Sequence, residues 1–299
     1  MKETGIALLL SSTVLGLFLF IPLSPQPEQA AAVTTPVKSG AYGDVAIAGK
    51  AAVVYDLLTD EILYEKNADA QLPLASLTKV LTVYAATRMF EPSTPITVSQ
   101  EAAAVEAPRA LSAGDTLAFS DIARLTLTGS LNDGAAAIAQ AVSAAAKKST
   151  DAALASATSA LGLSTIFAVN GNGLDENESF AGGYGSARDI AILAGTLARE
   201  APDIAGATTE QSATAVSKSG KRFTVQNTNP TVIHTTRLLF SKTGFTDLAG
   251  GNLAVVFDAG VNHPVAVVVL GSTQTERFTD VQALISSTLA HFAGLSAIE

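Results

Sequence analysis

The amino-acid sequence predicts an α+β fold, in which strands from the two ends of the chain form one antiparallel sheet and a helical subdomain is inserted between them. Two observations support this prediction. Strand-like apolar runs lie at 51–56 and 61–66 and again in the last third of the chain. The stretch between them, roughly 76–200, is rich in Ala and Leu and carries helix start and stop signals. Because strands at both ends flank a helical middle, we expect the ends to meet in one sheet.

The predicted strands are separated by turn signals. The first two, 51–56 and 61–66, flank a Leu-Leu-Thr-Asp turn and are typical of a β-hairpin. Four more strands are expected later in the chain, at 222–226, 238–243, 252–258 and 264–270. A final helix is expected after them, because apolar side chains recur there on one side at helical spacing. These side chains are Phe278, Val281, Leu284, Ile285, Leu289 and Phe292.

Within the helical middle, capping signals mark where helices begin and end. Thr150 precedes an Ala-rich segment that ends at Gly162, and Ser186 is followed three residues later by an acidic residue, as in a capping box. A glycine just beyond a helix adopts the left-handed conformation without strain, and a serine before a helix accepts an unpaired backbone N–H. The sequence therefore predicts helices at 151–161 and 187–200.

Composition excludes several classes of function. The chain has 299 residues, with 27 acidic and 18 basic side chains and a formal net charge of −9. Nucleic-acid binding needs a basic patch that neutralises phosphates, so nucleic acid is not an expected partner. No cysteine is present, which excludes disulfides, thiolate metal sites and cysteine nucleophiles. His234, His263 and His291 lack metal-ligand spacing and no nucleotide-binding glycine motif occurs, so no metal or other cofactor is expected.

The N-terminus carries a targeting signal. Residues 5–23 are uncharged and apolar, and as a helix they would reach about 28 Å, enough to cross a hydrocarbon core. The run could also be the core of a signal peptide, with a cleavage site at Ala30–Ala32. We therefore expect a membrane anchor, which we favour, or a signal peptide at 1–32, a linker at 33–42 and one catalytic domain at 43–299, located outside the cytoplasm.

Three short motifs could carry chemistry, and the first is a serine with a lysine. In "LPLASLTKV", Ser76 and Lys79 are three residues apart at the start of a helical segment, so their side chains share one face. A serine hydroxyl is a weak nucleophile until a base takes its proton, and a lysine can serve when burial lowers its pKa. Taken alone, the pair is weak evidence, because this spacing is common and often belongs to solvated side chains.

The second motif is Ser130 and Asn132 in "TGSLNDGAAAIAQ", between helical segments expected at 120–128 and 133–147. This spacing would aim both side chains the same way. The hydroxyl could pass on a proton, and the amide could both donate and accept hydrogen bonds. The alternative interpretation is structural, since Asn132 or Asp133 would make an ordinary helix N-cap.

The third motif, Lys-[Ser/Thr]-Gly, occurs twice. At Lys218–Gly220 the neighbours are polar, charged or glycine, as in an exposed hairpin turn. At Lys242–Gly244 the flanks are apolar, so we expect this copy on a sheet strand, where a glycine leaves room for a ligand to approach. Lys242 would contribute a fixed positive charge, and Thr243 a hydroxyl for a carboxylate. The sequence therefore favours the second copy as the functional one.

Together, in this order and each in a suitable element, the motifs are far more specific than any one alone. They match the serine acyl-transferase set of β-lactamases and penicillin-binding proteins. With "NGNGLDENESFAGGYGSARDIAILA", the segments around them resemble the D-alanyl-D-alanine carboxypeptidases, low-molecular-mass penicillin-binding proteins of the serine D,D-peptidase family. The resemblance covers roughly residues 43–295. It implies a β-lactamase/D,D-peptidase-like fold and removal of the terminal D-alanine from peptidoglycan stem peptides.

By this resemblance, the motif residues have roles in acyl transfer. Ser76 would attack the carbonyl of the penultimate D-alanine, and Lys79 would be the base. Ser130 would relay a proton to the leaving amine, and Asn132 would orient Lys79 and the substrate. Lys242 completes the implied catalytic set. The implied substrate-binding residues are Thr243, Gly244, Phe245 and Thr246. The oxyanion hole would be the backbone N–H groups of Ser76 and Phe245.

The resemblance also implies partners and leaves alternatives. Peptidoglycan ending in D-Ala-D-Ala is the implied substrate, β-lactam antibiotics are the implied inhibitors, and the membrane would be reached through 5–23. A D,D-endopeptidase that cuts wall cross-links would use the same residues. A β-lactamase would need a water-activating carboxylate, for which the loop at 173–179 is the candidate, whereas a non-catalytic wall-binding or β-lactam-sensing module would need no base. The stretch 252–270 has no Arg or Lys, so the residue that recognises a substrate carboxylate stays unidentified.

Overall fold

The structure, a computed structural model, describes residues 40–43, 45–235 and 237–296. The anchor or signal peptide expected at 1–32 and most of the linker expected at 33–42 lie outside these residues, so both stay predictions. Within the described part of the chain, no helix is both long and apolar enough to cross a membrane.

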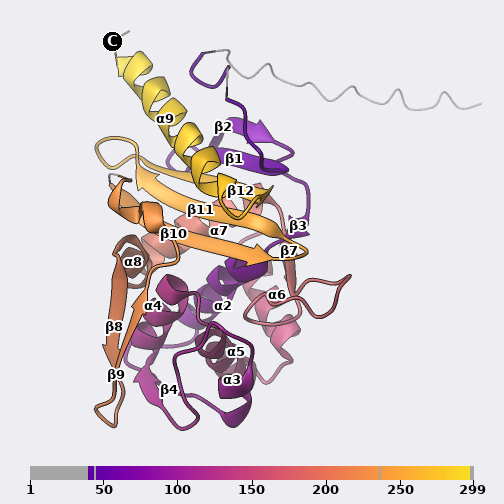
Figure 1. The fold of residues 1–299 in the computed structure, drawn as a ribbon, viewed down its shortest axis with the longest axis vertical. Coiled ribbons are helices and arrows are strands. Elements are labelled where there is room, and N and C mark those ends of the chain that lie inside the picture. Colours follow the sequence, from indigo (N-terminus) through magenta and orange to yellow (C-terminus); the bar gives the residue numbers. More distant parts are fainter. Residues whose placement is uncertain (1–39, 44, 236, 297–299) are drawn as a thin grey trace, which may run out of the picture. The chain divides into compact units, whose positions relative to one another are not determined.

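One five-stranded antiparallel sheet joins strands from the two ends of the chain (Figure 1). Its spatial order is β10-β11-β12-β1-β2. The strands are β1 (Ala51–Asp56), β2 (Glu61–Lys66), β10 (Leu238–Thr246), β11 (Gly250–Asp258) and β12 (Pro264–Ser272). β12 pairs with β1 in a register that sets Val268 opposite Val53. The α+β prediction is confirmed, and the first hairpin has the predicted bounds.

Helices fill the stretch between β2 and β10, again as predicted. The α-helices there are α2 (Thr78–Thr87), α3 (Gln100–Ala104), α4 (Phe119–Gly129), α5 (Asn132–Ala146), α6 (Thr150–Ala160), α7 (Ala187–Glu200) and α8 (Pro202–Gly206). The 3₁₀ turns are η1 (Ala75–Leu77), η2 (Ala207–Thr209) and η3 (Pro230–Ile233). After β12 comes α9 (Glu276–Ser296), the last described element.

Small sheets accompany the helices, and most of their strands give no signal in the sequence. They are β3 (Leu72–Pro73) with β7 (Gly183–Gly185) and β6 (Phe167–Ala168), β4 (Pro95–Thr97) with β5 (Thr116–Ala118), and β8 (Ser212–Val216) with β9 (Arg222–Gln226). Strands of two or three residues are too short to show alternation, whereas β8, with five residues, was simply not predicted. β9, which is longer, has the bounds that the sequence predicts.

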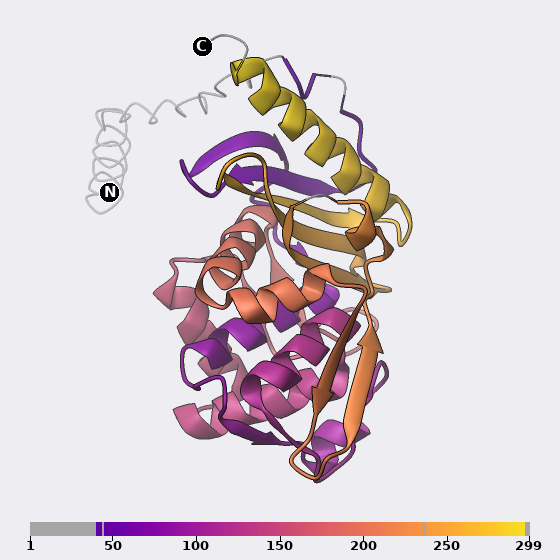
Figure 2. The same cartoon turned by 90° about the vertical axis from the view of Figure 1, so that its left-hand side faces the viewer.

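Both faces of the sheet are buried along β1, β11 and β12, which explains why these strands are almost continuously apolar. In β12, for example, Val267 belongs to the cluster under α9, whereas Val268 belongs to the larger core formed with the other helices. Figure 2 shows α9 on one side of the sheet and those helices on the other. Val281, Leu284 and Ile285 of α9 are buried against the sheet. The apolar side predicted for this helix is confirmed.

Two predicted helix boundaries are confirmed by their capping geometry. Ser186 Oγ accepts the backbone N–H of Asp189 at 3.1 Å, which caps the start of α7. α6 begins at Thr150, and Gly162, just past its end, has φ +69°. This is the left-handed conformation that a glycine adopts without strain after a helix.

A buried carboxylate on α9 ties the segment before β1 to the end of β12. Asp280, 5% exposed, accepts the backbone N–H groups of Ala48 and Gly49, both at 3.0 Å. It also accepts the Ser272 hydroxyl at 2.7 Å. One side chain thus satisfies three donors from segments that are far apart in the sequence.

Asp280→Ala should therefore lower the free energy of unfolding by about 2–4 kcal/mol, because three donors lose their acceptor. Urea unfolding followed by circular dichroism measures the change. Glu178→Ala removes an exposed carboxylate and, as the matched control, should change stability by less than about 0.5 kcal/mol. Equal stability of the two variants would show that the Asp280 contacts contribute nothing.

Candidate active site

The first motif pair lies where η1 leads into α2. Ser76 is in the 3₁₀ turn and Lys79 is in the first turn of the α-helix. Lys79 Nζ lies 2.7 Å from Ser76 Oγ and 2.6 Å from the carbonyl oxygen of Asn172. Ala75, just before Ser76, has φ +48°, which is uncommon for a residue with a Cβ. This turn sets the serine hydroxyl against the lysine amine.

Burial gives Lys79 the properties of a base. Its side chain is completely buried. Loss of hydration disfavours the ammonium, the nearby Lys242 disfavours it further, and Asp133 opposes both, so the pKa of Lys79 lies well below the usual lysine value. A neutral amine 2.7 Å from a serine hydroxyl can take the hydroxyl proton. Ser76 and Lys79 therefore have the geometry of a nucleophile and its base.

The second and third motifs are in direct contact. Ser130 ends α4 with φ +57°, and its Oγ accepts a hydrogen bond from Lys242 Nζ at 2.8 Å. Lys242 also donates to the carbonyl of Thr243 at 2.8 Å. Burial, and then the Arg277 guanidinium, lower the pKa of Lys242 to about 7. The expectation of a fixed positive charge is therefore corrected, because the charge of Lys242 titrates near neutrality.

Asn132 is placed differently from what the resemblance implied. Its Nδ2 donates to the carbonyl oxygens of Glu106 and Ala107, at 3.0 and 2.9 Å. Among the described residues, no hydrogen bond joins Asn132 to Lys79. The N-cap of α5 is Leu131, so the alternative of an asparagine cap is also wrong. Asn132 holds a neighbouring loop, and the role of orienting the lysine has no support in these contacts.

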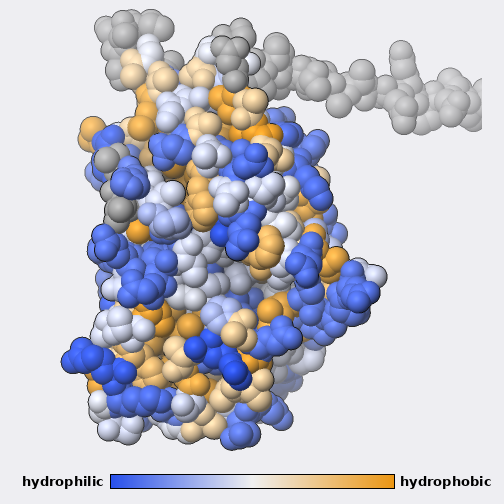
Figure 3. All heavy atoms as spheres, in the orientation of Figure 1, coloured by the Kyte–Doolittle hydropathy of each residue, from blue (hydrophilic) through white to orange (hydrophobic). Residues whose placement is uncertain are grey.

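The Lys-Thr-Gly copy at 242–244 lies on a sheet strand, as predicted, and this strand, β10, is one of the two edges of the five-stranded sheet. A Cβ on Gly244 would lie 2.9 Å from the carbonyl oxygen of Leu74 and 3.3 Å from the backbone nitrogen of Ser76. Glycine thus lets the strand pass close to the turn that carries the nucleophile. In Figure 3 the surface near this edge has intermediate hydropathy, between more hydrophilic regions.

The other predicted substrate-binding residues follow along β10. Thr243 is 4% exposed, and its hydroxyl oxygen lies 2.6 Å from that of Thr228. Phe245 is 44% exposed. Thr246 donates its hydroxyl proton to Asp175 at 3.0 Å, which joins the end of β10 to a neighbouring loop. The structure brings the three motifs together in one site.

The other Lys-Ser-Gly copy is a surface turn, as predicted. It lies between β8 and β9, where the Ser217 N–H donates to the carbonyl of Lys221 at 2.9 Å. Gly220 has φ +85°, and Lys218 is exposed to solvent. Lys218 therefore lacks the burial of Lys242, which is 1% exposed.

A buried arginine lies beside β10, although the stretch 252–270 has no basic residue. Arg277, in the first turn of α9, is 7% exposed, and its Nη1 donates to the carbonyl of Gly244 at 2.7 Å. Its Nε has no partner among the described residues. The sequence indicated a missing basic residue in the strand, but only the fold shows that the start of α9 reaches β10. The sequence also gave no sign that Asn172 belongs to the site, because it contacts Lys79 through its backbone carbonyl, which every residue has.

The carboxylates of the loop at 173–179 are engaged elsewhere. Asp175 accepts the Thr246 hydroxyl at 3.0 Å, and Glu176 accepts the side-chain amide of Asn170 at 2.6 Å. Neither carboxylate hydrogen-bonds the nucleophile or its base within the described part of the chain. Glu178, the third carboxylate of this loop, is exposed to solvent.

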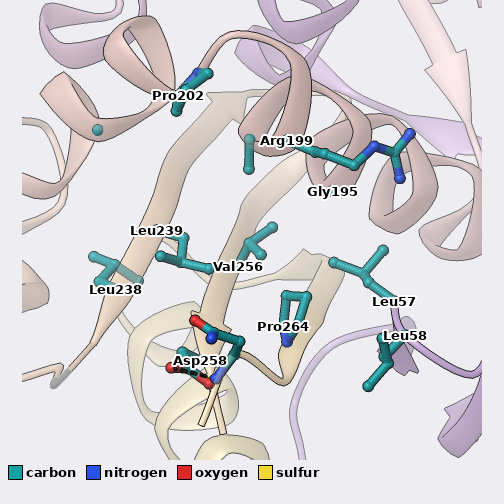
Figure 4. A pocket seen from close by; sticks show the side chains of 13 residues that line it. Leu57, Leu58, Gly195, Arg199, Pro202, Leu238, Leu239, Val256, Asp258 and Pro264 are labelled. Carbon is teal, nitrogen blue, oxygen red and sulfur yellow. Dashed lines mark hydrogen bonds between the residues drawn. The ribbon is translucent and has the colours of Figure 1, made fainter. Parts of the chain in front are cut away.

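A separate hollow of about 620 Å³ lies where β10 begins. Figure 4 shows Leu57 and Leu58 on one side of it, Leu238 and Leu239 on the other, and Val256 between them. Its lining is mainly apolar and contains none of the predicted site residues. This hollow is not the place of the acyl-transfer chemistry.

Comparison with known sequences agrees with the motifs. The sequence model of the D-alanyl-D-alanine carboxypeptidase family matches residues 35–274, which contain all three motifs. The D-alanyl-D-alanine carboxypeptidase DacC of Escherichia coli K12 is 27% identical over 303 residues, covering 95% of this chain and 69% of the relative. A D-alanyl-D-alanine endopeptidase of Pseudomonas aeruginosa is 28% identical over 258 residues, covering 84% of this chain and 80% of the relative.

Comparison with solved structures agrees with the fold. Penicillin-binding protein D2 of Listeria monocytogenes, in its cefotaxime-bound form, has a TM-score of 0.68 at 24% identity, covering 82% of this chain and 98% of that one. A D-alanyl-D-alanine carboxypeptidase of Mycobacterium tuberculosis H37Rv has a TM-score of 0.70 at 18% identity, covering 85% and 93%. These similarities confirm the predicted architecture of the D,D-peptidase type.

Proposed function

The chain belongs to the D-alanyl-D-alanine carboxypeptidase family, and we propose that its Ser76 site removes the terminal D-alanine from peptidoglycan stem peptides through an acyl-enzyme. The observation that carries this proposal is the buried Lys79, 2.7 Å from Ser76 Oγ. A non-catalytic wall-binding or β-lactam-sensing module would not need such a base. The protein is a serine-type hydrolase of this family.

Acylation begins when the neutral Lys79 amine takes the proton of the Ser76 hydroxyl. Ser76 Oγ then bonds to the carbonyl carbon of the penultimate D-alanine, and negative charge develops on the carbonyl oxygen. Backbone N–H groups of Ser76 and Phe245 are the proposed donors to this oxygen, where Gly244 lets β10 approach the turn. Losing one such donor typically costs about a hundredfold or more in rate.

The bond between the two D-alanines breaks as the leaving nitrogen receives a proton. We assign this proton to Ser130, which Lys242 resupplies from 2.8 Å away. With a pKa of about 7, Lys242 can both give and regain a proton near neutral pH. Once Lys79 has lost its proton to solvent, it activates the water that attacks the acyl-enzyme. The shortened peptide then leaves with a new carboxylate, and Ser76 regains its proton.

Recognition of the free C-terminal carboxylate is assigned to Thr243 and Arg277. Thr243 provides a hydroxyl donor on β10. Arg277 provides a positive charge on a side chain that is only 7% exposed. One guanidinium nitrogen of Arg277 holds the carbonyl of Gly244 at 2.7 Å, whereas Nε is unpaired among the described residues. A carboxylate on β10 would therefore meet a weakly screened charge, which supports preference for peptides with a free C-terminus.

D,D-endopeptidase activity is the second candidate function. Two relatives named D-alanyl-D-alanine endopeptidase are each matched along 80% of their own length. The same nucleophile and base would cut the amide bond of a wall cross-link. β-Lactam antibiotics fit either activity as inhibitors that acylate Ser76, and penicillin-binding protein D2 is known in cefotaxime- and ampicillin-bound forms.

We further propose that the catalytic domain works outside the cytoplasm. The substrate class lies there, and the apolar run at 5–23 has the length of a membrane anchor or of an extended signal-peptide core. Fractionation of cells that make the full chain tests this, because an anchored domain sediments with membranes until protease releases it from the outer side.

Ser76→Ala should abolish covalent labelling by a fluorescent penicillin and the release of D-alanine from a D-Ala-D-Ala pentapeptide, because the attacking oxygen is gone. Ser219→Ala, in the surface Lys-Ser-Gly turn, is the matched control and should behave as wild type. Labelling that persists in Ser76→Ala would refute the nucleophile assignment. A cross-linked peptide dimer assayed in parallel separates the two candidate activities, since cleavage of the dimer alone would favour the endopeptidase.

Arg277→Gln should raise the KM for the D-Ala-D-Ala pentapeptide about tenfold to a hundredfold, because the carboxylate loses a charge-assisted partner. It should also raise the pKa of Lys242, which Arg277 lowers. Steady-state kinetics and the pH profile measure the two effects. Arg199→Gln removes an exposed arginine of α7 and should leave KM unchanged. An unchanged KM in Arg277→Gln would exclude it from carboxylate binding.

A further inference from the structure

Thr243, the hydroxyl assigned to the substrate carboxylate, has a hydroxyl partner outside the three motifs. Thr228 lies between β9 and η3, and its Oγ1 is 2.6 Å from that of Thr243. Thr243 is 4% exposed, whereas Thr228 is half-buried. The distance is that of a strong hydrogen bond between hydroxyls, so one of the two protons is shared and the other is left for a ligand.

Hydrogen bonds of Thr228 and of the residues on either side of it hold Thr228 in position. Its backbone N–H donates to the carbonyl of Thr128 at 3.2 Å, two residues before Ser130. On one side, the Asn227 amide donates to two backbone carbonyls, both at 2.8 Å. On the other side, the Asn229 amide donates to Ser241 Oγ at 2.7 Å. The Thr228 hydroxyl is therefore held in place before substrate arrives, which is what a positioning group needs.

The hydroxyl of Thr228 is not required to attach its segment to β10. Asn229 already makes that attachment through Ser241, and Asn227 anchors the segment to the stretch that follows α8. The Thr228 hydroxyl can instead determine the direction in which the Thr243 hydroxyl proton points. If Thr228 donates to Thr243 Oγ1, the Thr243 proton must point elsewhere, and a hydroxyl that accepts one hydrogen bond becomes a better donor in the next.

We propose that Thr228 is a positioning residue that donates to Thr243 Oγ1, so that the proton of Thr243 is directed to the C-terminal carboxylate of the peptide. This rests on the proposed function and deepens it, since it assigns part of the preference for a free carboxylate to a residue outside the three motifs. No bond is made or broken in this step. Only the direction of two hydroxyl protons is set.

The test is a double-mutant cycle with Thr228→Val, Thr243→Val and the double variant, because valine keeps the shape and removes the hydroxyl. Each protein is assayed for kcat/KM on a D-Ala-D-Ala pentapeptide and on an N-acyl-D-alanine thioester whose leaving group has no carboxylate. Thr228→Val should lower kcat/KM for the peptide about threefold to tenfold, mainly through KM, and leave the thioester nearly unchanged. In the Thr243→Val background, Thr228→Val should have no further effect.

Two further variants separate this role from a merely structural one. Thr228→Ser keeps the hydroxyl and should restore the wild-type KM. Thr224→Val removes one hydroxyl of another threonine pair, Thr214 and Thr224, whose exposed oxygens are 3.1 Å apart on the β8–β9 hairpin, and it should act as wild type on both substrates.

Several outcomes would overturn the proposal. These are equal losses on both substrates, additive losses in the double variant, or no loss in Thr228→Val. They differ from failure of the proposed function itself, which would appear as a wild-type protein that cleaves neither substrate. A wild type that cleaves both, with Thr228→Val unchanged, would leave the carboxypeptidase assignment standing and remove only the role of Thr228.

Discussion

The active site depends on the burial of two lysines where the edge of the sheet meets the helices. Lys79 comes from α2 and Lys242 from β10, and both are almost completely shielded from solvent. Burial disfavours the ammonium form of both lysines, Lys242 lowers the pKa of Lys79 further, and Arg277 lowers the pKa of Lys242. In the proposed mechanism, this burial makes Lys79 a base for Ser76 and makes Lys242 a proton donor to Ser130 whose charge depends on pH.

Keeping these groups together requires uncommon backbone at several points. Ala75 and Ser130 have φ of +48° and +57°, conformations that cost a residue with a Cβ about 1–3 kcal/mol each. Gly244 allows β10 to pass beside the nucleophile's turn, and the carbonyl of Asn172 receives the second hydrogen bond of Lys79. The surrounding core, buried on both faces of the sheet, holds this local strain in place.

The sequence predicted the parts of this protein that local pattern determines. The hairpin 51–66, the strand at Lys242 and the apolar side of the last helix follow from alternation and spacing. The three ordered motifs predict which serine is the nucleophile. Contacts between distant residues could not be predicted this way. Arg277 reaches Gly244 only because α9 begins beside β10, and Asn132 binds a loop that no motif marks. The lowered pKa of Lys242 likewise depends on burial, which a motif does not specify.

The most direct test of the account is the pH dependence of the second-order rate constant for acylation of Ser76 by penicillin. Lys79 acts as a base only when neutral, so the rate should rise with pH through the pKa of Lys79. It should then fall as Lys242, the proton donor behind Ser130, loses its proton with a pKa of about 7. Because burial lowers this pKa, the rise should be complete well below 10.5, the ordinary value for a lysine. Circular dichroism at each pH establishes that the fold is intact. A rate that keeps climbing to pH 10 and beyond would contradict a neutral, buried lysine base.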